Sequence, residues 1–540
     1  NMQPVLNVDD IKRVEVALTR VGVSVSELMH RAGYAAAAEV LELGNVENVV
    51  VLAGMGNNGG DGWVAAEALL RKHINVKVVS PIEPDQLSGD LARQVAQSAV
   101  RAGVSVLVGP SRDELEGLFS TADAVLDCML GTGFRGELRA PFDIWIDCLN
   151  DSGARVVAVD VPSGLSAQSG HAPGPAVMAD MTVTMLALKP GLLADDGRDL
   201  CGSIVVAPLA EQTERLVNDS DPVAWRTDLS DYLDVMLPSV TSVDKFSRGS
   251  VLVVGGSSRF PGAPIMAARA AARAGAGYVT LAVPETIVPV VQSHLIEIPV
   301  VGLPADSDGI ISSEARNEVV RLARENSTTL VGPGMRVTSG TVSAVSALLS
   351  ADMPLVVDAD GLNCISRLTS GALPEFPELL RRTAPLVLTP HRRELGRLVG
   401  NDDTPPDSLA SQLEIARRII WADGGSELTI VTKGTATGCV GVEQAILPKP
   451  GPAVLATAGS GDVLAGMIAS LLAQTAGKFD DYPLLCALAC EIHGYAGSIA
   501  AERYGSRGVM ATDIIDAIGL ASDAVEERIS FPDADAAEEA

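Results

Sequence analysis

Short runs of aliphatic and β-branched residues alternate with longer, alanine-rich amphipathic segments along most of the chain. This alternation is typical of parallel sheets whose strands are joined by helical crossovers. The pattern occurs as two series, separated by a polar stretch at 211–245. The first series predicts strands near 48–53, 75–80, 104–108, 123–128, 154–160 and 181–187. The second predicts strands near 250–254, 278–283, 328–332, 354–358, 385–389 and 428–432, then helices at 461–475, 483–503 and 511–521.

The two series predict two unrelated α/β domains, because they share no motif. Length alone would suit about three or four domains for 540 residues, but the pattern supports domains at 1–222 and 223–525. The stretch 211–245 is predicted to be a linker with a peripheral helix. The last fifteen residues, 526–540, hold six acids and one arginine, which predicts a disordered acidic tail.

Acidic residues outnumber basic ones, with 68 Asp and Glu against 40 Lys and Arg and a net charge of -28. Such a chain repels nucleic-acid phosphates and anionic membrane surfaces, so we expect neither as a partner. A small anionic ligand can still bind where local dipoles overcome the global field.

The seven cysteines are an odd number without a C-x-x-C pair, which is not the pattern of a disulfide framework. Cys486 and Cys490 are expected to be buried thiols on a helix. Charged or polar residues, such as Glu491 and His493, interrupt the longest apolar stretches, and the N-terminus has no signal-peptide pattern. These observations predict a cytoplasmic protein.

A glycine-rich turn, G-M-G-N-N-G-G-D-G at Gly54–Gly62, follows the first strand and precedes a helix. It satisfies the G-x-G-x-x-G dinucleotide fingerprint, in which backbone N–H groups and the helix N-terminus favour a phosphate. The acid that an ordinary dehydrogenase places after the second strand is missing. A tight structural turn is the alternative, but the polar residues Asn57, Asn58 and Asp61 favour a ligand.

Three further polar loops follow strands in the first half, within D-C-M-L-G-T-G-F-R-G, V-D-V-P-S-G and L-K-P-G. Since carboxyl ends of parallel strands share one edge of a sheet, we expect Asn58, Asp127, Asp160, Ser163 and Lys189 to converge. A carboxylate beside an ammonium can serve as acid and base, and we assign those roles to Asp160 and Lys189 as a hypothesis.

In this order the motifs resemble the NAD(P)H-hydrate epimerase domain of YjeF-type proteins, over about 210 residues. L-M-H-R-A-G at Leu28–Gly33 also matches, with His30 where glutamate is common. The resemblance implies inversion at C6 of the hydrated nicotinamide ring and a K+ ion held by Asn58, Asp127 and Ser163. It also implies that Asp160 lines the substrate site, together with Asn57, Asn58, Gly59, Gly60, Asp61, Gly131, Thr132, Gly133, Phe134, Arg135, Gly136 and Glu137.

In the second half T-A-G-S-G-D-V-L-A-G at Thr457–Gly466 opens a helix. Its amides and the helix dipole can stabilise a transferring phosphoryl group, and Asp462 can accept a proton from an attacking hydroxyl. Simple helix capping is the alternative for Asp462. No Walker A sequence is present, so a P-loop enzyme is excluded.

This motif, with P-G-A-P, G-P-G, D-A-D-G-L-N, T-P-H-R-R-E and K-G-T-A-T, resembles the ribokinase-like superfamily and most closely its ADP-dependent NAD(P)H-hydrate dehydratases. The resemblance implies phosphorylation of the C6 hydroxyl followed by phosphate elimination, with Asp462 as base and Mg2+ organised by Glu394. Ala263, Gly334 and His391 would contact the hydrated cofactor. The nucleotide would contact Lys433, Gly434, Thr435, Ala436, Thr437, Gly459, Ser460 and Gly461.

The fold class predicted is therefore α/β, with a Rossmann-like three-layer domain followed by a ribokinase-like three-layer domain. The expected ligands are NAD(P)H hydrate, ADP, K+ and Mg2+, and close packing of alanine-rich helices leads us to expect a homo-oligomer. Two alternatives stay open: a kinase of a small hydroxylated metabolite, and a binding protein that only senses a dinucleotide. No residue in the sequence distinguishes ADP from ATP, or NADH hydrate from NADPH hydrate.

Overall fold

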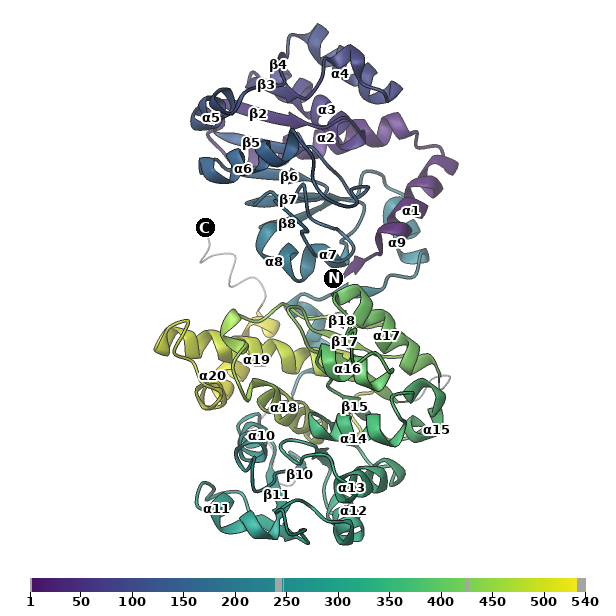
Figure 1. Cartoon of the computed structure of the whole chain (residues 1–540), viewed down its shortest axis with the longest axis vertical. Coiled ribbons are helices and arrows are strands. Elements are labelled where there is room, and N and C mark those ends of the chain that lie inside the picture. Colours follow the sequence, from purple (N-terminus) through teal and green to yellow (C-terminus); the bar gives the residue numbers. More distant parts are fainter. Residues whose placement is uncertain (1, 238–244, 246, 423–426, 532–540) are drawn as a thin grey trace. The chain divides into compact units, whose positions relative to one another are not determined.

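A computed structural model describes residues 2–237, 245, 247–422 and 427–531. The chain divides into two compact units. The N-terminal unit comprises Gln3–Val223 with Ser408–Ala410, and the C-terminal unit comprises Ala224–Asp407 and the chain from Ser411 onward, with Met2. Each unit is an α/β body with its own sheet (Figure 1).

The N-terminal unit is built on a parallel sheet with the strand order β4-β3-β2-β5-β6-β7-β8. These strands are β2 (Asn48–Ala53), β3 (Asn75–Ser80), β4 (Ser105–Val108), β5 (Ala124–Cys128), β6 (Val156–Val159), β7 (Met181–Met185) and β8 (Ser203–Ala207). Buried strands of a parallel sheet read as continuous apolar runs, which is why the sequence pattern identifies most of them.

Helices cover both faces of this sheet. Val49 and Val51 pack with α1 (Val8–Arg20), α2 (Val25–Glu42), α3 (Asn57–Arg71) and α4 (Asp90–Ala102). Val50 and Leu52 point to the other face, where α5 (Arg112–Thr121) and α6 (Phe142–Ser152) lie. The remaining short elements are β1 (Gln3–Val5), α7 (Pro190–Leu193), α8 (Asp196–Leu200) and α9 (Thr213–Asp219). The predicted three-layer arrangement is therefore present.

The sheet of the C-terminal unit runs in the order β9-β18-β17-β16-β15-β14-β13-β10-β11-β12. Its strands are β9 (Ala224–Arg226), β10 (Ser250–Val254), β11 (Tyr278–Pro284), β12 (Val300–Leu303), β13 (Thr328–Val331), β14 (Leu355–Val357), β15 (Leu386–Leu388), β16 (Leu428–Thr432), β17 (Gly438–Val440) and β18 (Ala445–Leu447). Along this order, every pair of neighbouring strands from β16 through β10 to β12 is parallel. Strand β17 is antiparallel to both of its neighbours, β16 and β18.

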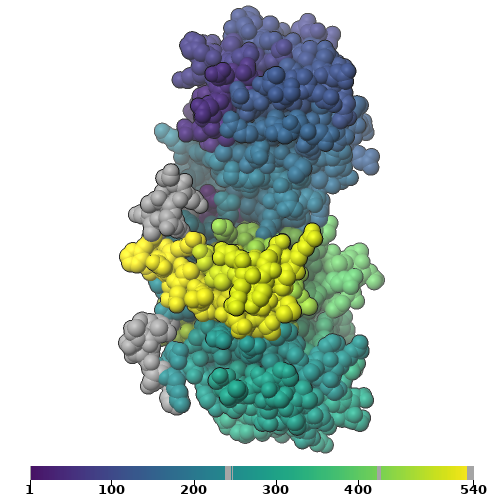
Figure 2. Space-filling model, turned by 90° about the vertical axis from the view of Figure 1, so that its left-hand side faces the viewer, coloured from purple at the N-terminus to yellow at the C-terminus, as the bar shows by residue number. Residues whose placement is uncertain are grey.

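One face of this sheet packs against α10 (Gly262–Arg273), α18 (Ser460–Gln474), α19 (Tyr482–Tyr504) and α20 (Ala511–Ser530). Figure 1 places the other helices on the opposite side: α12 (Arg316–Arg324), α13 (Ser339–Ser350), α14 (Asp360–Leu368), α15 (Pro377–Leu380), α16 (Arg392–Leu398) and α17 (Leu409–Ala422). The short helix α11 (Val288–Gln292) precedes β12. Figure 2 shows the C-terminal helices, coloured yellow, on the surface of this unit.

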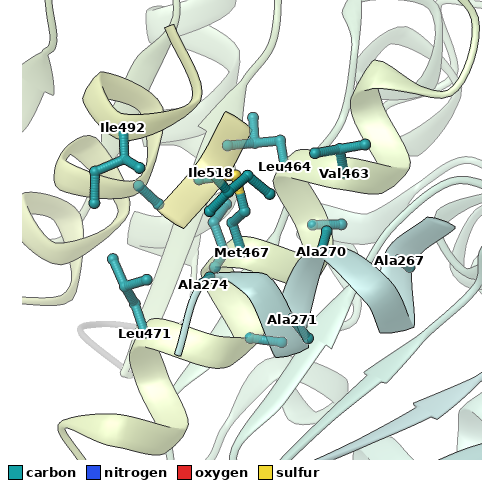
Figure 3. Packing of buried hydrophobic residues seen from close by; sticks show 14 of the residues in the cluster. Ala267, Ala270, Ala271, Ala274, Val463, Leu464, Met467, Leu471, Ile492 and Ile518 are labelled. Atoms are coloured by element: carbon teal, nitrogen blue, oxygen red, sulfur yellow. The ribbon is translucent and has the colours of Figure 1, made fainter. Parts of the chain in front are cut away.

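Alanines allow α10 and α18 to approach closely. Ala267, Ala270, Ala271 and Ala274 face Met467 and its neighbours on α18 (Figure 3). A Cβ atom added to Gly466 would lie 2.2 Å from the carbonyl oxygen of Ala267. A chain with only 3% aromatic residues thus fills this part of its core by bringing backbones together.

Two sequence expectations need correction. Residues 224–235 are not a linker: β9 joins the sheet beside β18, and Tyr232 and Val235 are buried in the core. Residues 238–244 and 246, in the same predicted linker, lie outside the described residues. The tail prediction is wrong at 526–530, because α20 continues to Ser530 with Ile529 buried. Residues 532–540 again lie outside the described part.

The apolar stretch that Glu491 and His493 interrupt in the sequence forms one continuous helix, Tyr482–Tyr504. By length and composition this helix could cross a membrane, but 72% of its most apolar window is buried inside the protein.

Candidate functional sites

In the N-terminal unit, strand order brings the predicted polar loops together. The strands β2, β5, β6 and β7 are consecutive neighbours in the sheet, so the loops after them meet at one edge. The glycine turn follows β2, Asp160 follows β6, and Lys189 lies in the segment after β7. A parallel sheet binds ligands at this edge.

Asp127 and Ser163 form a buried cluster, and neither is exposed to solvent. The Ser163 hydroxyl donates to Asp127 Oδ1 at 2.6 Å, and the Ser163 amide donates to Oδ2 at 2.7 Å. The amide of Met129 also donates to Oδ1. Burial raises the pKa of Asp127 to about 6, while these hydrogen bonds from Ser163 and Met129 act in the opposite direction.

Lys189 is the charged centre of this site, and its side chain is fully buried. Its ammonium donates to Asp160 Oδ1 at 2.9 Å and to Thr184 Oγ1 at 2.7 Å. It also donates to the carbonyl oxygens of Met185 and Ala187. Asp160 has a backbone φ of +71°, a strained conformation for a non-glycine residue that is typical of functional sites. The hypothesised acid–base pair is therefore in direct contact.

Asn58 is the polar residue that lacks partners. It is buried, and neither its amide nitrogen nor its carbonyl oxygen has a hydrogen-bond partner among the described residues. Leaving such groups unpaired costs free energy, so the Asn58 side chain is available to bind a ligand. A Cβ on Gly131 would lie 3.4 Å from Asn58 Cβ and 3.7 Å from Asp160 Oδ2, which places Gly131, Asn58 and Asp160 together.

Further carboxylates lie around this pair. Burial, followed by the charges of Asp160 and Glu15, raises the pKa of Asp61 well above its usual value. Burial and the charge of Asp160 also raise the pKa of Glu15 on α1, against the lowering effect of Lys189. Sequence reasoning missed Glu15, because an acid on a polar helix face carries no signal of its own.

The remaining predicted residues of the N-terminal site lie in two segments, at the start of α3 and in the loop after β5. Asn57, Gly59 and Gly60 lie in the first turn of α3. A Cβ on Gly59 would lie 2.0 Å from the carbonyl oxygen of Gly54, so that turn admits only glycine. The segment 132–137 forms the loop after β5: Thr132 and Phe134 accept hydrogen bonds through their carbonyls from Arg135, while Gly133, Gly136 and Glu137 are exposed.

The C-terminal unit has a second lysine–carboxylate pair at the corresponding edge of its sheet. The ammonium of Lys433, after β16, donates to Asp358 Oδ1, after β14, at 2.9 Å. Thr389, after β15, donates to the same oxygen at 2.8 Å. Asp358 is 1% exposed. The sequence analysis includes the motif D-A-D-G-L-N, which begins at Asp358, but does not name Asp358 as a site residue. Its position directly after a buried strand could have identified it.

Glu394 and His391 form the start of α16. The His391 amide donates to Glu394 Oε2 at 2.9 Å, and the imidazole Nδ1 accepts from the Glu394 amide at 3.3 Å. Burial raises the pKa of Glu394 to about 7, opposed by Lys433 and assisted by Asp358. Burial and the charge of Lys433 lower the pKa of His391. The charge of the Lys433 ammonium therefore lowers the pKa of both groups.

Asp462 stands in the first turn of α18, behind a turn that needs glycine. Gly459 has a φ of +89°, and a Cβ on Gly461 would lie 3.2 Å from Lys433 Nζ. Burial raises the pKa of Asp462 to about 7, with a further contribution from Asp358 and an opposing one from Lys433. The structure thus brings Lys433, Asp358 and Asp462 into one electrostatic group.

The other predicted residues of the C-terminal site lie in neighbouring loops. Ala263 is in the first turn of α10, and a Cβ on Gly334 would approach its Cβ to 3.2 Å. Gly434, Thr435, Ala436 and Thr437 form the turn between β16 and β17. Ser460 is buried and shares a hydrogen bond of 3.1 Å with His493 Nε2, a residue that sequence reasoning treated only as an interruption of an apolar stretch.

These features define a two-centre α/β enzyme. One centre is a polar site with a lysine–carboxylate pair, and the other combines a lysine–carboxylate pair with a carboxylate at a glycine-rich helix start. Family models match both units: residues 25–191 match the YjeF-related protein N-terminus, and residues 251–520 match NAD(P)H-hydrate dehydratase.

Known proteins resemble most of the chain. The bifunctional NAD(P)H-hydrate repair enzyme of Salinibacter ruber is 36% identical over 518 residues, which is 91% of each chain. The Escherichia coli enzyme of the same description is 32% identical over 519 residues, 94% of this chain and 92% of its own. The solved ADP/ATP-dependent NAD(P)H-hydrate dehydratase of Bacillus subtilis, co-crystallised with ATP and Mg2+, is 22% identical and covers 55% of this chain and 97% of its own, with a TM-score of 0.43. The chain belongs to the family of bifunctional NAD(P)H-hydrate repair enzymes.

Proposed function

We propose that residues 1–222 epimerise the R and S forms of NAD(P)H hydrate and that residues 223–525 dehydrate the S form with ADP. The observation that supports this most directly is a lysine–carboxylate pair, 2.9 Å apart, at the sheet edge of each unit. Each pair stands beside a glycine-rich turn suited to a nucleotide phosphate. One chain then returns both epimers to the usable cofactor.

In the N-terminal site the pair Asp160 and Lys189 moves protons at the C6 hydroxyl. The ammonium donates a proton, the hydroxyl leaves as water, and a water molecule adds to the opposite face of the ring. Asp160 accepts the proton released by the incoming water, which restores the hydrate with inverted C6. The fixed contact of the two groups keeps donor and acceptor at the same carbon.

Asn58, Asp127 and Ser163 would hold K+ beside this centre. The donor set fits a hard monovalent cation, because Asn58 presents a buried carbonyl oxygen without a partner and Asp127 a carboxylate. A cation there supplies positive charge near the phosphates of the substrate. The acidic chain has few basic side chains at this site for that purpose.

In the C-terminal site Asp462 accepts the proton of the C6 hydroxyl, whose oxygen then attacks the terminal phosphorus of ADP and displaces AMP. Amides of Gly459–Gly461 stabilise the transferring group. The C6–oxygen bond then breaks, phosphate departs, and a proton leaves C5 to form the ring double bond. Hydroxide is a poor leaving group, so phosphorylation makes the elimination feasible.

Lys433 and the turn to Thr437 would bind the nucleotide, and Ala263, Gly334 and His391 the hydrated cofactor. Mg2+ would enter with the nucleotide phosphates, because it binds few protein carboxylates and retains waters. Glu394 is the carboxylate proposed to orient it. Both Glu394 oxygens face His391, which suits a contact through water.

We further propose a cytoplasmic homo-oligomer. Several large apolar side chains on or beside the C-terminal helices are exposed, among them Met510 at 62% and Leu520 at 66%, and a second copy could cover them. Size-exclusion chromatography with light scattering measures the molar mass of the assembly. If the variant Leu520→Glu has the same molar mass as the wild type, Leu520 is not part of the interface.

The decisive experiment separates the epimers. The protein is incubated with purified R or S hydrate, with and without ADP, and the dihydronicotinamide absorbance is followed. Recovery of the absorbance from the S hydrate, only when ADP is present, supports the dehydratase. Recovery from the R hydrate that is lost in the variant Asp160→Asn supports the epimerase. Phosphorylation of a small alcohol without any recovery of absorbance would favour the kinase alternative.

A further inference from the structure

His493 is a buried titratable residue that the proposed mechanism does not use. It lies on α19 and is 6% exposed. Its Nε2 atom shares the hydrogen bond with Ser460 Oγ, and Ser460 is also buried. Burial and the charge of Lys433 lower the pKa of His493 to about 4, so the imidazole is neutral at neutral pH.

Several other contacts of α19 are made with the chain just before Ser460. Glu491 Oε1 accepts a hydrogen bond from the Lys449 amide at 2.7 Å. A Cβ on Gly494 would lie 3.2 Å from the Cα of Gly451, and a Cβ on Gly497 would lie 2.7 Å from Leu455 Cδ2. The helix therefore contacts residues 449–460 from the end of β18 to the start of α18.

The position of Ser460 gives this contact a catalytic consequence. Ser460 stands between Gly459 and Gly461, the two glycines of the proposed anion-binding turn, and two residues before Asp462. Glycines leave the turn conformationally permissive, so it needs an external restraint. The imidazole provides a side-chain hydrogen bond to the middle of the turn.

We propose that His493 is a positioning residue for the dehydratase: through Ser460 it fixes the amides of the Gly459–Gly461 turn and the carboxylate of Asp462 against the transferring phosphoryl group. This inference rests on the proposed function of the C-terminal site. His493 itself touches neither substrate nor nucleotide. Its loss misplaces groups that act in the transition state, so it lowers kcat more than it weakens ground-state binding.

The test is a double-mutant cycle in the full-length protein with S hydrate and ADP. His493→Ala and Ser460→Ala each lower kcat about tenfold or more, since small displacements of catalytic groups have large effects on rate. The double variant falls no further than either single one, because one interaction has been removed. KM for ADP changes less than about threefold. His493→Gln, which keeps a hydrogen-bonding group, recovers part of the rate.

Ile492→Val is the matched control. Ile492 precedes His493 on α19 and is buried in the core (Figure 3), so its truncation removes one buried methyl group and leaves kcat unchanged. Additive losses in the double variant, or a kcat for His493→Ala equal to that of wild type, would overturn the inference. Wild-type protein without ADP-dependent dehydration would instead refute the proposed function.

Discussion

Replacing Asp160 with asparagine tests the N-terminal site through both stability and rate. The substitution keeps the shape of the side chain but leaves the buried Lys189 ammonium without its anion. Breaking a buried ion pair in this way costs about 3–5 kcal/mol. The lower value applies here, because Asp160 is 16% exposed and three oxygen acceptors still face the ammonium.

A loss of about 3 kcal/mol corresponds to a fall of roughly 6–12 °C in the melting temperature of a domain of this size. Differential scanning calorimetry measures that fall in the transition of the N-terminal unit. Conversion of R to S hydrate slows by about 100-fold or more, the contribution of one general acid or base. Dehydration of purified S hydrate with ADP serves as the internal control and keeps its rate.

The second substitution, Lys189→Met, completes the argument. In the double variant no buried charge is left unpaired, so at least half of the lost stability returns, whereas epimerisation stays lost. A melting temperature of Asp160→Asn within about 2 °C of wild type would refute the electrostatic reasoning. So would a double variant whose two losses simply add.

Three further predictions concern the C-terminal unit. Asp462→Asn lowers the rate of ADP-dependent dehydration by about 100-fold or more and leaves epimerisation unchanged, as measured with each epimer separately. Because the pKa of Asp462 is raised to about 7 and only the carboxylate accepts a proton, kcat/KM for dehydration is constant above about pH 8, is halved near pH 7 and falls about tenfold per unit below about pH 6. Gly466→Ala drives a methyl group against the Ala267 carbonyl, which destabilises the unit by about 1–2 kcal/mol after the gain in helix propensity, measured by urea unfolding.

Each of these has its own contrary result. Residual dehydration near the wild-type rate in Asp462→Asn would make Asp462 a helix cap only. A profile that stays flat from pH 8 to about pH 5.5 would remove Asp462 as the base whose titration limits the rate. For Gly466→Ala the control is Gly519→Ala in α20, where an added Cβ meets nothing within 4 Å; equal effects of the two substitutions would contradict the packing argument.

The long strands and both glycine turns follow directly from the sequence, because a buried parallel strand must be apolar on both faces. The short strands do not: β9 has three residues, too few for a pattern, and it joins the sheet through a long-range pairing with β18. Its existence depends on tertiary packing that a local pattern cannot express.

The sequence pattern could place Asp160, Lys189 and Lys433 at the same edges of the sheets, because these residues follow predicted strands. Their partners were not predictable, since contacts such as Lys433 with Asp358 depend on which strands are neighbours. Glu491 and His493 illustrate the same limit. In the sequence they interrupt an apolar helix, whereas in the fold they are the groups through which that helix holds residues 449–460.

The alanine-lined contact between α10 and α18 has a consequence for the precision of the second site. Alanine has no side-chain rotamers to lose when it is buried, so this contact forms without the entropic cost that leucine or methionine would add. For the same reason, the alanines of α10 cannot adjust to a disturbance at this contact by adopting another rotamer. The position of Asp462 at the start of α18 is therefore set by backbone against backbone, and thermal motion of the α10 side chains has little means of displacing it.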